Sequence, residues 1–206
     1  MRDWTENQIN LLLIRHGETP SNRLKRYLGR TEEDLSELGI RNLLIQKEKG
    51  KYPKADIIFS SPMRRCIQTA KILYDCKEPF LIEEWREIDF GRFEGKNYKE
   101  LSGDASYQAW IDSNGELPFP EGESREEFLL RCQRGLQKAA AELLRKERKT
   151  PVTAAFIVHG GTIMALLSSF CGGSYYYYQC KNTEGYGCSL QLLPNQEIII
   201  KIIQKL

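Results

Sequence analysis

The stretch Ile9-Asn10-Leu11-Leu12-Leu13-Ile14-Arg15-His16-Gly17 decides the fold of this chain. From Ile9 to Arg15 it is a short, mostly apolar run, and the run ends abruptly in polar residues. Runs of this kind are typical of parallel strands that are buried on both faces of a sheet. The pattern therefore predicts a buried strand over residues 9–15, with His16 at its carboxyl end.

Two further segments have the same character. Residues 55–59 are followed by Ser61-Pro62, which we interpret as the N-cap and first residue of a helix reaching about residue 73, with Arg64 and Arg65 in its first turn. Residues 153–158 end in a Gly-Gly loop, and a helix is expected over residues 163–170. The layout of strand, loop and helix therefore recurs along the chain.

Other segments predict the elements that surround these strands. Ser36 is a candidate N-cap for a first crossover helix, and Ser124-Arg125-Glu126-Glu127 is a capping box that opens a long amphipathic helix ending near residues 145–149. Residues 189–193 and 197–203, joined by Pro194-Asn195, are typical of a hairpin that adds antiparallel edge strands.

The predicted fold class is α/β: a three-layer α/β/α sandwich with a mostly parallel sheet, an antiparallel edge and an inserted cap. Between Trp85 and Pro120 the pattern weakens into Gly, Asp, Asn and aromatic residues, which favours an excursion that covers a site. Because no repeat or linker is present, we expect residues 1–206 to form one domain, with a cap-like excursion at about 88–122. In such sheets ligands bind at the carboxyl ends of the strands.

The composition excludes several classes of function. The chain has 30 Lys plus Arg against 28 Asp plus Glu and lacks a basic, aromatic-studded stripe, so we expect no nucleic-acid partner. The apolar stretch 11–14 is far too short for a signal sequence or a membrane span, so we expect no membrane association and a cytoplasmic location. No feature of the sequence indicates an oligomeric state.

Six cysteines are scattered along the chain without any C-x-x-C pair. Their surroundings resemble helices and core strands rather than a disulfide framework, so we expect reduced thiols. The spacing of the last three matches no compact zinc pattern. No metal site is therefore predicted from the cysteines.

The chain has only two histidines, His16 and His159, and both stand where an apolar strand ends and a glycine-containing loop begins. One such histidine would more often be structural, but the pair favours a shared site. Arg15, Arg65 and the helix that opens at Gly160 add cations and a helix N-terminus at the same strand ends, a combination that attracts a dianion.

A phosphate monoester carries about −1.5 to −2 charges, and guanidinium groups can hold it in a bidentate manner that lysine cannot match. The same positive surroundings disfavour protonation of His16. A neutral imidazole nitrogen is then free to attack phosphorus.

Four ordered motifs resemble those of a known family. Arg15-His16-Gly17-Glu18-Thr19, followed by Asn22, is similar to the R-H-G-E-[ST]-x-x-N signature of the histidine phosphatase superfamily, which has the phosphoglycerate mutase-like fold. Residues 60–70 resemble the segment S-S-P-x-x-R-A-x-Q-T-A, whose phosphate-binding arginine falls on Arg65. Residues 87–95 resemble E-x-x-x-G-x-[WF]-E-G, and His159-Gly160-Gly161-Thr162 resembles the motif of the second histidine.

The resemblance spans nearly the whole chain, from Leu11 to Leu193, and implies a catalytic mechanism. His16 would form a phosphohistidine, and the implied phosphoryl-binding residues are Arg15, Asn22, Arg65, His159 and Gly160. Glu87 is implied to protonate the leaving alkoxide and then to activate water, and a nearby dianion would raise its pKa in the required direction. No metal or cofactor is implied, and the expected partner is a small phosphorylated substrate.

The same phosphohistidine serves a phosphatase or a mutase, and the core motifs fit both. The short stretch after Glu87 resembles phosphatases more than phosphoglycerate mutases. Within the phosphatases it resembles α-ribazole phosphatases and small broad-specificity bacterial enzymes, although Met164 stands where many of these have arginine. A non-catalytic phospho-ligand or partner-binding module is the remaining alternative. Tyr175 to Tyr178 cannot share one face, so we expect some of these rings in the core and others at the lid.

Overall fold

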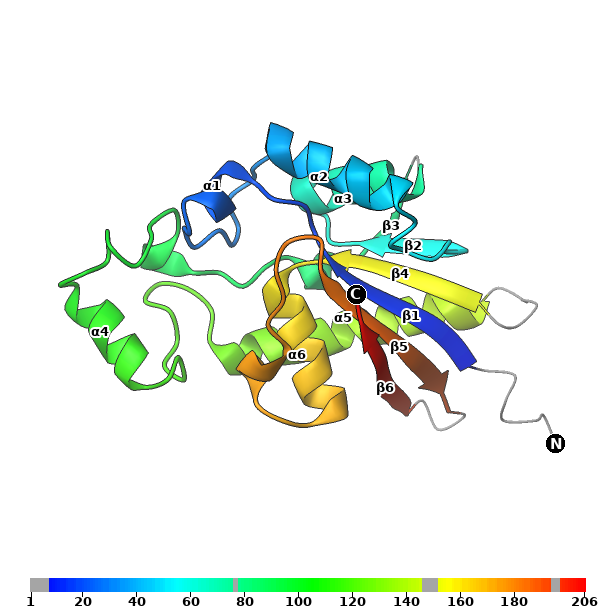
Figure 1. Ribbon diagram of the computed structural model, residues 1–206. Coiled ribbons are helices and arrows are strands. Elements are labelled where there is room, and N and C mark those ends of the chain that lie inside the picture. Colours follow the sequence, from blue (N-terminus) through cyan, green and yellow to red (C-terminus); the bar gives the residue numbers. More distant parts are fainter. Residues whose placement is uncertain (1–7, 76–77, 146–151, 194–196) are drawn as a thin grey trace.

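The protein, described here by a computed structural model over residues 8–75, 78–145, 152–193 and 197–206, is built on a six-stranded sheet (Figure 1). The strand order is β3-β2-β4-β1-β5-β6. The strands are β1 Gln8–Arg15, β2 Ile57–Ser60, β3 Phe80–Leu81, β4 Val152–Val158, β5 Gly185–Leu192 and β6 Ile198–Lys205. The first four strands in this order run parallel, whereas β5 and β6 are antiparallel to their neighbours. The mostly parallel sheet with an antiparallel edge is therefore confirmed.

Alternation of side chains along β1 divides the core in two. Leu11 and Leu13 belong to one buried cluster, and Leu12 and Ile14 belong to the other. Successive residues of a strand point to opposite faces of the sheet, so an unbroken apolar run is what a strand covered on both faces requires.

Helices cover both faces of the sheet, which gives the predicted three layers (Figure 1). Helices α2 (Glu37–Glu48) and α3 (Arg64–Tyr74) pack against each other on one side, and α5 (Arg125–Arg145) and α6 (Gly160–Cys171) pack together on the other. Ser36 caps α2 by accepting the N–H of Gly39, and Ser124 and Glu127 form the predicted capping box at α5. No helix within the described ranges is long and apolar enough to cross a membrane.

Two helix starts differ from the prediction. Helix α3 begins at Arg64 with Met63 as N-cap, so Ser61-Pro62 is not the cap and first turn. The Ser61 hydroxyl instead accepts the N–H of Met63 and lies against a histidine ring. Helix α6 begins at Gly160 rather than Ile163, because the two glycines themselves form its first turn.

The segment between Glu87 and α5 leaves the sheet. It carries the 3-10 helix η3 (Gly91–Phe93) and helix α4 (Ala105–Asp112), which lies well away from the sheet in Figure 1. The closing hairpin is present as β5 and β6, although its turn at Pro194-Asn195 lies outside the described residues.

Candidate active site

The register of the parallel strands brings three segments to one edge of the sheet. Arg15 of β1 pairs with Val158 of β4, and Ser60 of β2 pairs with Ile157, so the three strands end at the same level. The next residues in each chain segment, His16, His159 and Ser61, are therefore neighbours. The rings of His16 and His159 lie 5.2 Å apart between centroids, in an edge-to-face arrangement.

The His16 ring is held in a single tautomer. Its Nδ1 lies 2.7 Å from the carbonyl oxygen of Gly17, which can only accept a hydrogen bond. Nδ1 therefore carries the proton, and the lone pair is on Nε2. Burial lowers the pKa of His16 well below its usual value, and the charges of Arg65 and Arg15 lower it further. The ring is consequently a neutral base with a free nitrogen.

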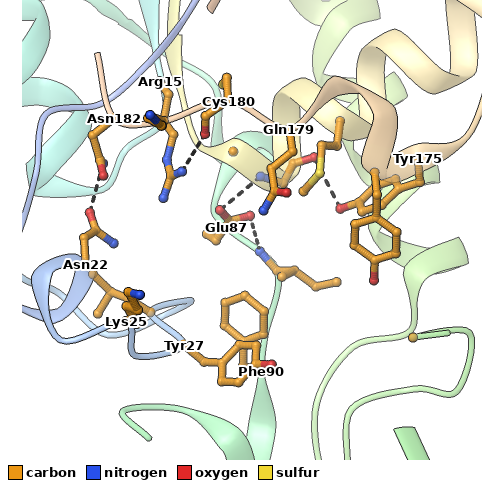
Figure 2. Close-up of a pocket in the computed structure, with 18 of the residues that line it drawn as sticks. Arg15, Asn22, Lys25, Tyr27, Glu87, Phe90, Tyr175, Gln179, Cys180 and Asn182 are labelled. Carbon is orange, nitrogen blue, oxygen red and sulfur yellow. Dashed lines mark hydrogen bonds between the residues drawn. The ribbon is translucent and has the colours of Figure 1, made fainter. Parts of the chain in front are cut away.

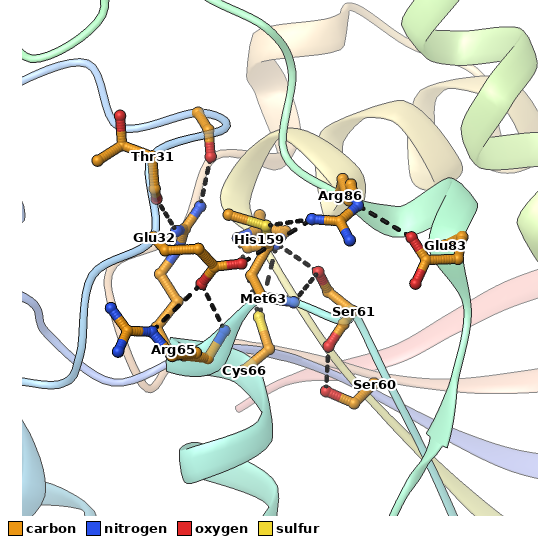
Figure 3. A network of polar contacts seen from close by, with 12 residues as sticks. Thr31, Glu32, Ser60, Ser61, Met63, Arg65, Cys66, Glu83, Arg86 and His159 are labelled. Carbon is orange, nitrogen blue, oxygen red and sulfur yellow. Dashed lines mark hydrogen bonds and ion pairs between the residues drawn. The ribbon is translucent and has the colours of Figure 1, made fainter.

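The second histidine is fully buried and is oriented by a serine. Nε2 of His159 lies 2.8 Å from the Ser61 hydroxyl, and the Cys66 thiol lies 3.6 Å from the same nitrogen (Figure 3). Burial is the main cause that lowers the pKa of His159, followed by the charge of Arg65. Burial also raises the pKa of the Cys66 thiol to about 12, so that thiol stays protonated.

Two guanidinium groups flank the histidines, and both are only partly satisfied. Nη1 of Arg15 donates to the carbonyl of Cys180 at 2.7 Å. Arg65, which is fully buried, donates from Nη1 to Thr31 O and from Nη2 to Gly29 O. The Nε atom of each arginine is buried without a hydrogen-bond partner among the described residues. Buried charged donors of this kind need an acceptor, and an oxyanion is the acceptor that suits a guanidinium group.

The Glu94 side chain fixes the loop whose carbonyl groups bind Arg65. Its Oε1 accepts the backbone N–H groups of Gly29 and Thr31, at 2.8 and 2.9 Å. The carbonyls of the same two residues accept hydrogen bonds from Arg65. A side chain at position 29 would overlap the carbonyl of Ile88, so only glycine permits this close approach. Arg92, two residues earlier, pairs with Asp104 instead.

Glu87 lies beside the N-terminus of α6. Its two carboxyl oxygens accept N–H groups from Ile88 at 3.0 Å and from Gly161 at 3.3 Å. A side chain at position 161 would overlap the carboxyl group, which explains the second glycine of this motif. Burial raises the pKa of Glu87 above its usual value, against the lowering effects of these N–H groups and of Arg65 and Arg15. The raised pKa thus favours the protonated form of Glu87.

Asn22 has a structural role and also lines the cavity described below. It forms a capping box with Thr19 at the short helix α1 (Pro20–Arg23). Its Oδ1 accepts a hydrogen bond from Nδ2 of Asn182 at 2.9 Å, and the same nitrogen lies 3.1 Å from the carbonyl oxygen of His16. The amide oxygen of Asn22 is therefore engaged by Asn182, and its amide nitrogen remains the group that can donate to a ligand.

Asn182 is a neighbour of His16 and Asn22 that no sequence motif predicts. This residue shortly precedes β5, which runs antiparallel to β1, so the amino end of β5 meets the carboxyl end of β1. The only signal in the sequence was its place just before the predicted edge hairpin. Arg64, by contrast, is exposed and pairs with Glu32 and Asp34.

A cavity of about 830 Å³ opens in front of His16 (Figure 2). Arg15, His16, Asn22, Glu87 and Gly160 line it, whereas Arg65 and His159 do not: they are fully buried close to His16. Basic side chains outnumber acidic ones in the lining, with Lys25, Arg125, Lys181 and Lys205 among them. The local potential therefore favours an anion, although the whole chain is nearly neutral.

The four tyrosines of the 3-10 helix η4 (Tyr175–Tyr178) divide as expected. Tyr178 is buried in the core, Tyr175 and Tyr176 line the cavity, and Tyr177 is exposed. Met164, on the first half of α6, also lines the cavity. An apolar side chain therefore stands at this point of the cavity lining.

A three-layer α/β fold with histidines and arginines gathered at the carboxyl ends of its parallel strands is typical of enzymes that handle phosphorylated ligands. The chain belongs to the histidine phosphatase superfamily (branch 1), whose family model matches residues 11–193. It is thus an enzyme of the phosphatase class.

Similar proteins differ in the substrates that their names carry. The metal-independent phosphoserine phosphatase of Arabidopsis thaliana is 29% identical over 163 residues, which cover 76% of this chain and 66% of the relative. A 2,3-bisphosphoglycerate-dependent phosphoglycerate mutase of Bifidobacterium longum is 28% identical over 190 residues, covering 76% and 75%.

Solved structures that are similar to this chain also carry different substrates in their names. A mutant phosphoserine phosphatase from Entamoeba histolytica, in complex with phosphoserine, aligns with a TM-score of 0.73 and 28% identity over 96% of both chains. The α-ribazole phosphatase of Shigella flexneri aligns with a TM-score of 0.76 over 94% of this chain and 95% of its own, at 19% identity, which indicates the shared fold alone.

Proposed function

We propose that the protein hydrolyses small phosphomonoesters through a phosphohistidine at His16. The observation that carries this proposal is the free Nε2 of a neutral His16 beside two arginines, Arg15 and Arg65, whose buried Nε atoms have no partner among the described residues. An imidazole lone pair is a competent nucleophile toward phosphorus, and fixed guanidinium groups stabilise the charge on the transferring group.

The proposed reaction has two steps. In the first, Nε2 of His16 bonds to phosphorus while the bond between phosphorus and the leaving oxygen breaks, and Glu87 gives that oxygen its proton. In the second, a water molecule attacks the phosphohistidine, Glu87 takes a proton from the water, and inorganic phosphate leaves His16. Arg15, Arg65, His159, Asn22 and the N–H end of α6 at Gly160 would bind the phosphoryl oxygens throughout.

Two features favour this role for Glu87. Burial raises its pKa, so the group is inclined to hold the proton that the first step consumes. Its carboxyl group is fixed by two backbone N–H groups and lines the same cavity as His16. The raised pKa of Glu87 and the lowered pKa of His16 therefore both favour the neutral form, in one site.

The proposal includes a cap and a cellular location. We propose that residues 88–122 form a cap on a single domain, because Phe90, Trp110 and Phe119 of this segment line the cavity. A cytoplasmic location is also proposed. Names of similar proteins suggest phosphoserine, 3-phosphoglycerate and α-ribazole 5′-phosphate as candidate substrates, and α-ribazole 5′-phosphate is the one favoured by the sequence motifs.

The second candidate function is a phosphoglycerate mutase, which the relative from Bifidobacterium longum supports. Both reactions use the same phosphohistidine, and they differ only in whether water or a second substrate hydroxyl accepts the phosphoryl group. The short segment between Glu87 and α5 favours water, by analogy with the compact phosphatases.

The test is phosphate release by the wild type and by His16→Ala from p-nitrophenyl phosphate, α-ribazole 5′-phosphate, phosphoserine and 3-phosphoglycerate, with EDTA present. We expect release by the wild type alone, unaffected by the chelator. Isomerisation of phosphoglycerate without release would establish the mutase instead. Absence of any turnover, with ligand binding retained in His16→Ala, would establish a non-catalytic binding module.

A further inference from the structure

The part of the cavity beyond Glu87 is unusually rich in aromatic side chains. Phe90, Trp110 and Phe119 come from the cap segment, Tyr27 comes from the loop after α1, and Tyr175 and Tyr176 come from η4. In Figure 2, Tyr27 and Phe90 lie next to each other below Glu87, and Tyr175 lies to one side of it. Rings from three separate segments therefore surround the space that a leaving group would occupy.

These rings do more than fill the interior of the cap. Phe93 is fully buried and Phe119 nearly so, and they form the packed centre of the aromatic group. Tyr27, Phe90 and Trp110 pack against this centre and are only partly buried, so each keeps surface toward the cavity. The three cavity-lining rings are thus rigidly backed by other rings. We call Tyr27, Phe90 and Trp110 the aromatic wall.

The cavity lining offers few carboxylates to the ammonium group of an amino acid. Phosphoserine carries an ammonium group, which needs a carboxylate or several acceptors. Glu87 and Glu184 are the acidic residues in the lining, as far as the described ranges show. Glu87 is engaged by the backbone of Ile88 and Gly161, and Glu184 accepts the N–H of Lys181 and faces Lys205.

Resting on the function proposed above, we propose that the enzyme takes phosphomonoesters whose leaving alcohol carries a flat aromatic or heteroaromatic ring, and that this ring packs on the aromatic wall. A flat ring gains from stacking and edge-to-face contacts that a saturated ring of equal size does not make. The volume of about 830 Å³ accommodates a phosphoryl group together with such a ring. Met164, also in the lining, adds a sulfur that packs well against aromatic rings.

The test compares benzyl phosphate with cyclohexylmethyl phosphate, which share a primary alcohol and a six-membered ring and differ in flatness. For the wild type we expect kcat/KM to favour benzyl phosphate by about tenfold. Trp110→Leu should reduce this preference to about twofold or less. The matched control is Tyr177→Leu, which removes a ring that is 77% exposed and does not line the cavity. The control should keep the wild-type preference.

Phe90→Leu serves as the second variant if Trp110→Leu does not fold, as judged by circular dichroism and thermal melting. Equal kcat/KM for both esters in the wild type would overturn the aromatic-ring inference and leave the phosphatase proposal standing. An unchanged preference in both wall variants would also overturn it. If the wild type releases phosphate from neither ester nor from p-nitrophenyl phosphate, the phosphatase proposal itself fails.

Discussion

At the scale of single residues, the site depends on two groups whose pKa values are shifted in opposite directions. The pKa of His16 is lowered, mainly by burial, so the ring stays neutral well below pH 6.5. The pKa of Glu87 is raised, also mainly by burial, so its carboxyl group keeps a proton above pH 4.5. A low-dielectric setting disfavours the charged form of each group, and both neutral forms are those that the first step of the proposed reaction requires.

The pH dependence of phosphorylation follows from these shifts. With benzyl phosphate, whose leaving group is poor, the single-turnover rate should fall as pH rises through the raised pKa of Glu87, because the proton is then lost. No fall is expected near pH 6.5 on the acid side, since His16 is still neutral there. Rapid-quench measurement of phosphoenzyme across pH 4 to 9 checks both the fall at high pH and the absence of a fall near pH 6.5.

Glu87→Gln should slow benzyl phosphate by about 10²-fold or more and remove the fall at high pH, because an amide cannot donate the proton. The variant should slow p-nitrophenyl phosphate much less, since that leaving group needs no acid. Equal slowing of the two esters would reject Glu87 as the proton donor.

At the scale of elements, the strands and most helices could be predicted, because burial on both faces and helix caps are local signals. The run 9–15 and the capping box at Ser124 correspond closely to β1 and α5. The start of α3 was predicted too early. The Ser61 hydroxyl accepts the N–H of Met63 and also contacts His159, but the helix begins only at Arg64.

The candidate site was predictable only in part, because some of its contacts join segments that are distant in the sequence. His16, Arg15 and Glu87 line one cavity, as expected from the motifs, and Arg65 and His159 are buried near it. Asn182 and the loop at residues 28–31 contribute through contacts between segments more than 30 residues apart, which no local pattern encodes. Contacts between a site and backbone groups that are distant in the sequence become apparent only when the fold brings these segments together.

Glu94 provides a test of that support, because it orients Arg65 through the loop at residues 28–31. Glu94→Ala should remove two hydrogen bonds from this loop and lower kcat/KM for p-nitrophenyl phosphate about tenfold. Glu94→Gln keeps an acceptor oxygen of the same reach and should stay within a few-fold of the wild type. Steady-state kinetics of folded variants gives the comparison.

A double-mutant cycle separates positioning of Arg65 from general loss of stability. In an Arg65→Ala background, Glu94→Ala should have little further effect on kcat/KM, because the group that it positions is gone. Independent, additive losses in the cycle would mean that Glu94 does not act through Arg65.

At the scale of the whole molecule, the anion site lies where the two halves of the core meet. His16 and His159 follow central strands, Arg65 belongs to α3 on one face of the sheet, and Gly160 begins α6 on the other. The charges of Arg65 and Arg15 both act on His16, and each guanidinium group has a buried Nε that lacks a partner within the described part of the chain. An oxyanion between them would join both helical layers to the sheet, so its binding should be coupled to global stability.

Inorganic phosphate is the probe for this coupling. At ten times its dissociation constant, measured separately by calorimetry, phosphate should raise the free energy of unfolding by about 1.4 kcal/mol, because it binds the native state alone. Arg64→Ala, which removes the exposed neighbour of Arg65, should retain this gain at the same concentration. Arg65→Ala should abolish it, and Arg65→Lys, which keeps the charge without the planar fork, should lose most of it. Urea denaturation with and without phosphate gives all four values. An equal gain in wild type and both Arg65 variants would show that phosphate binds elsewhere, and the site built around Arg65 would have to be abandoned.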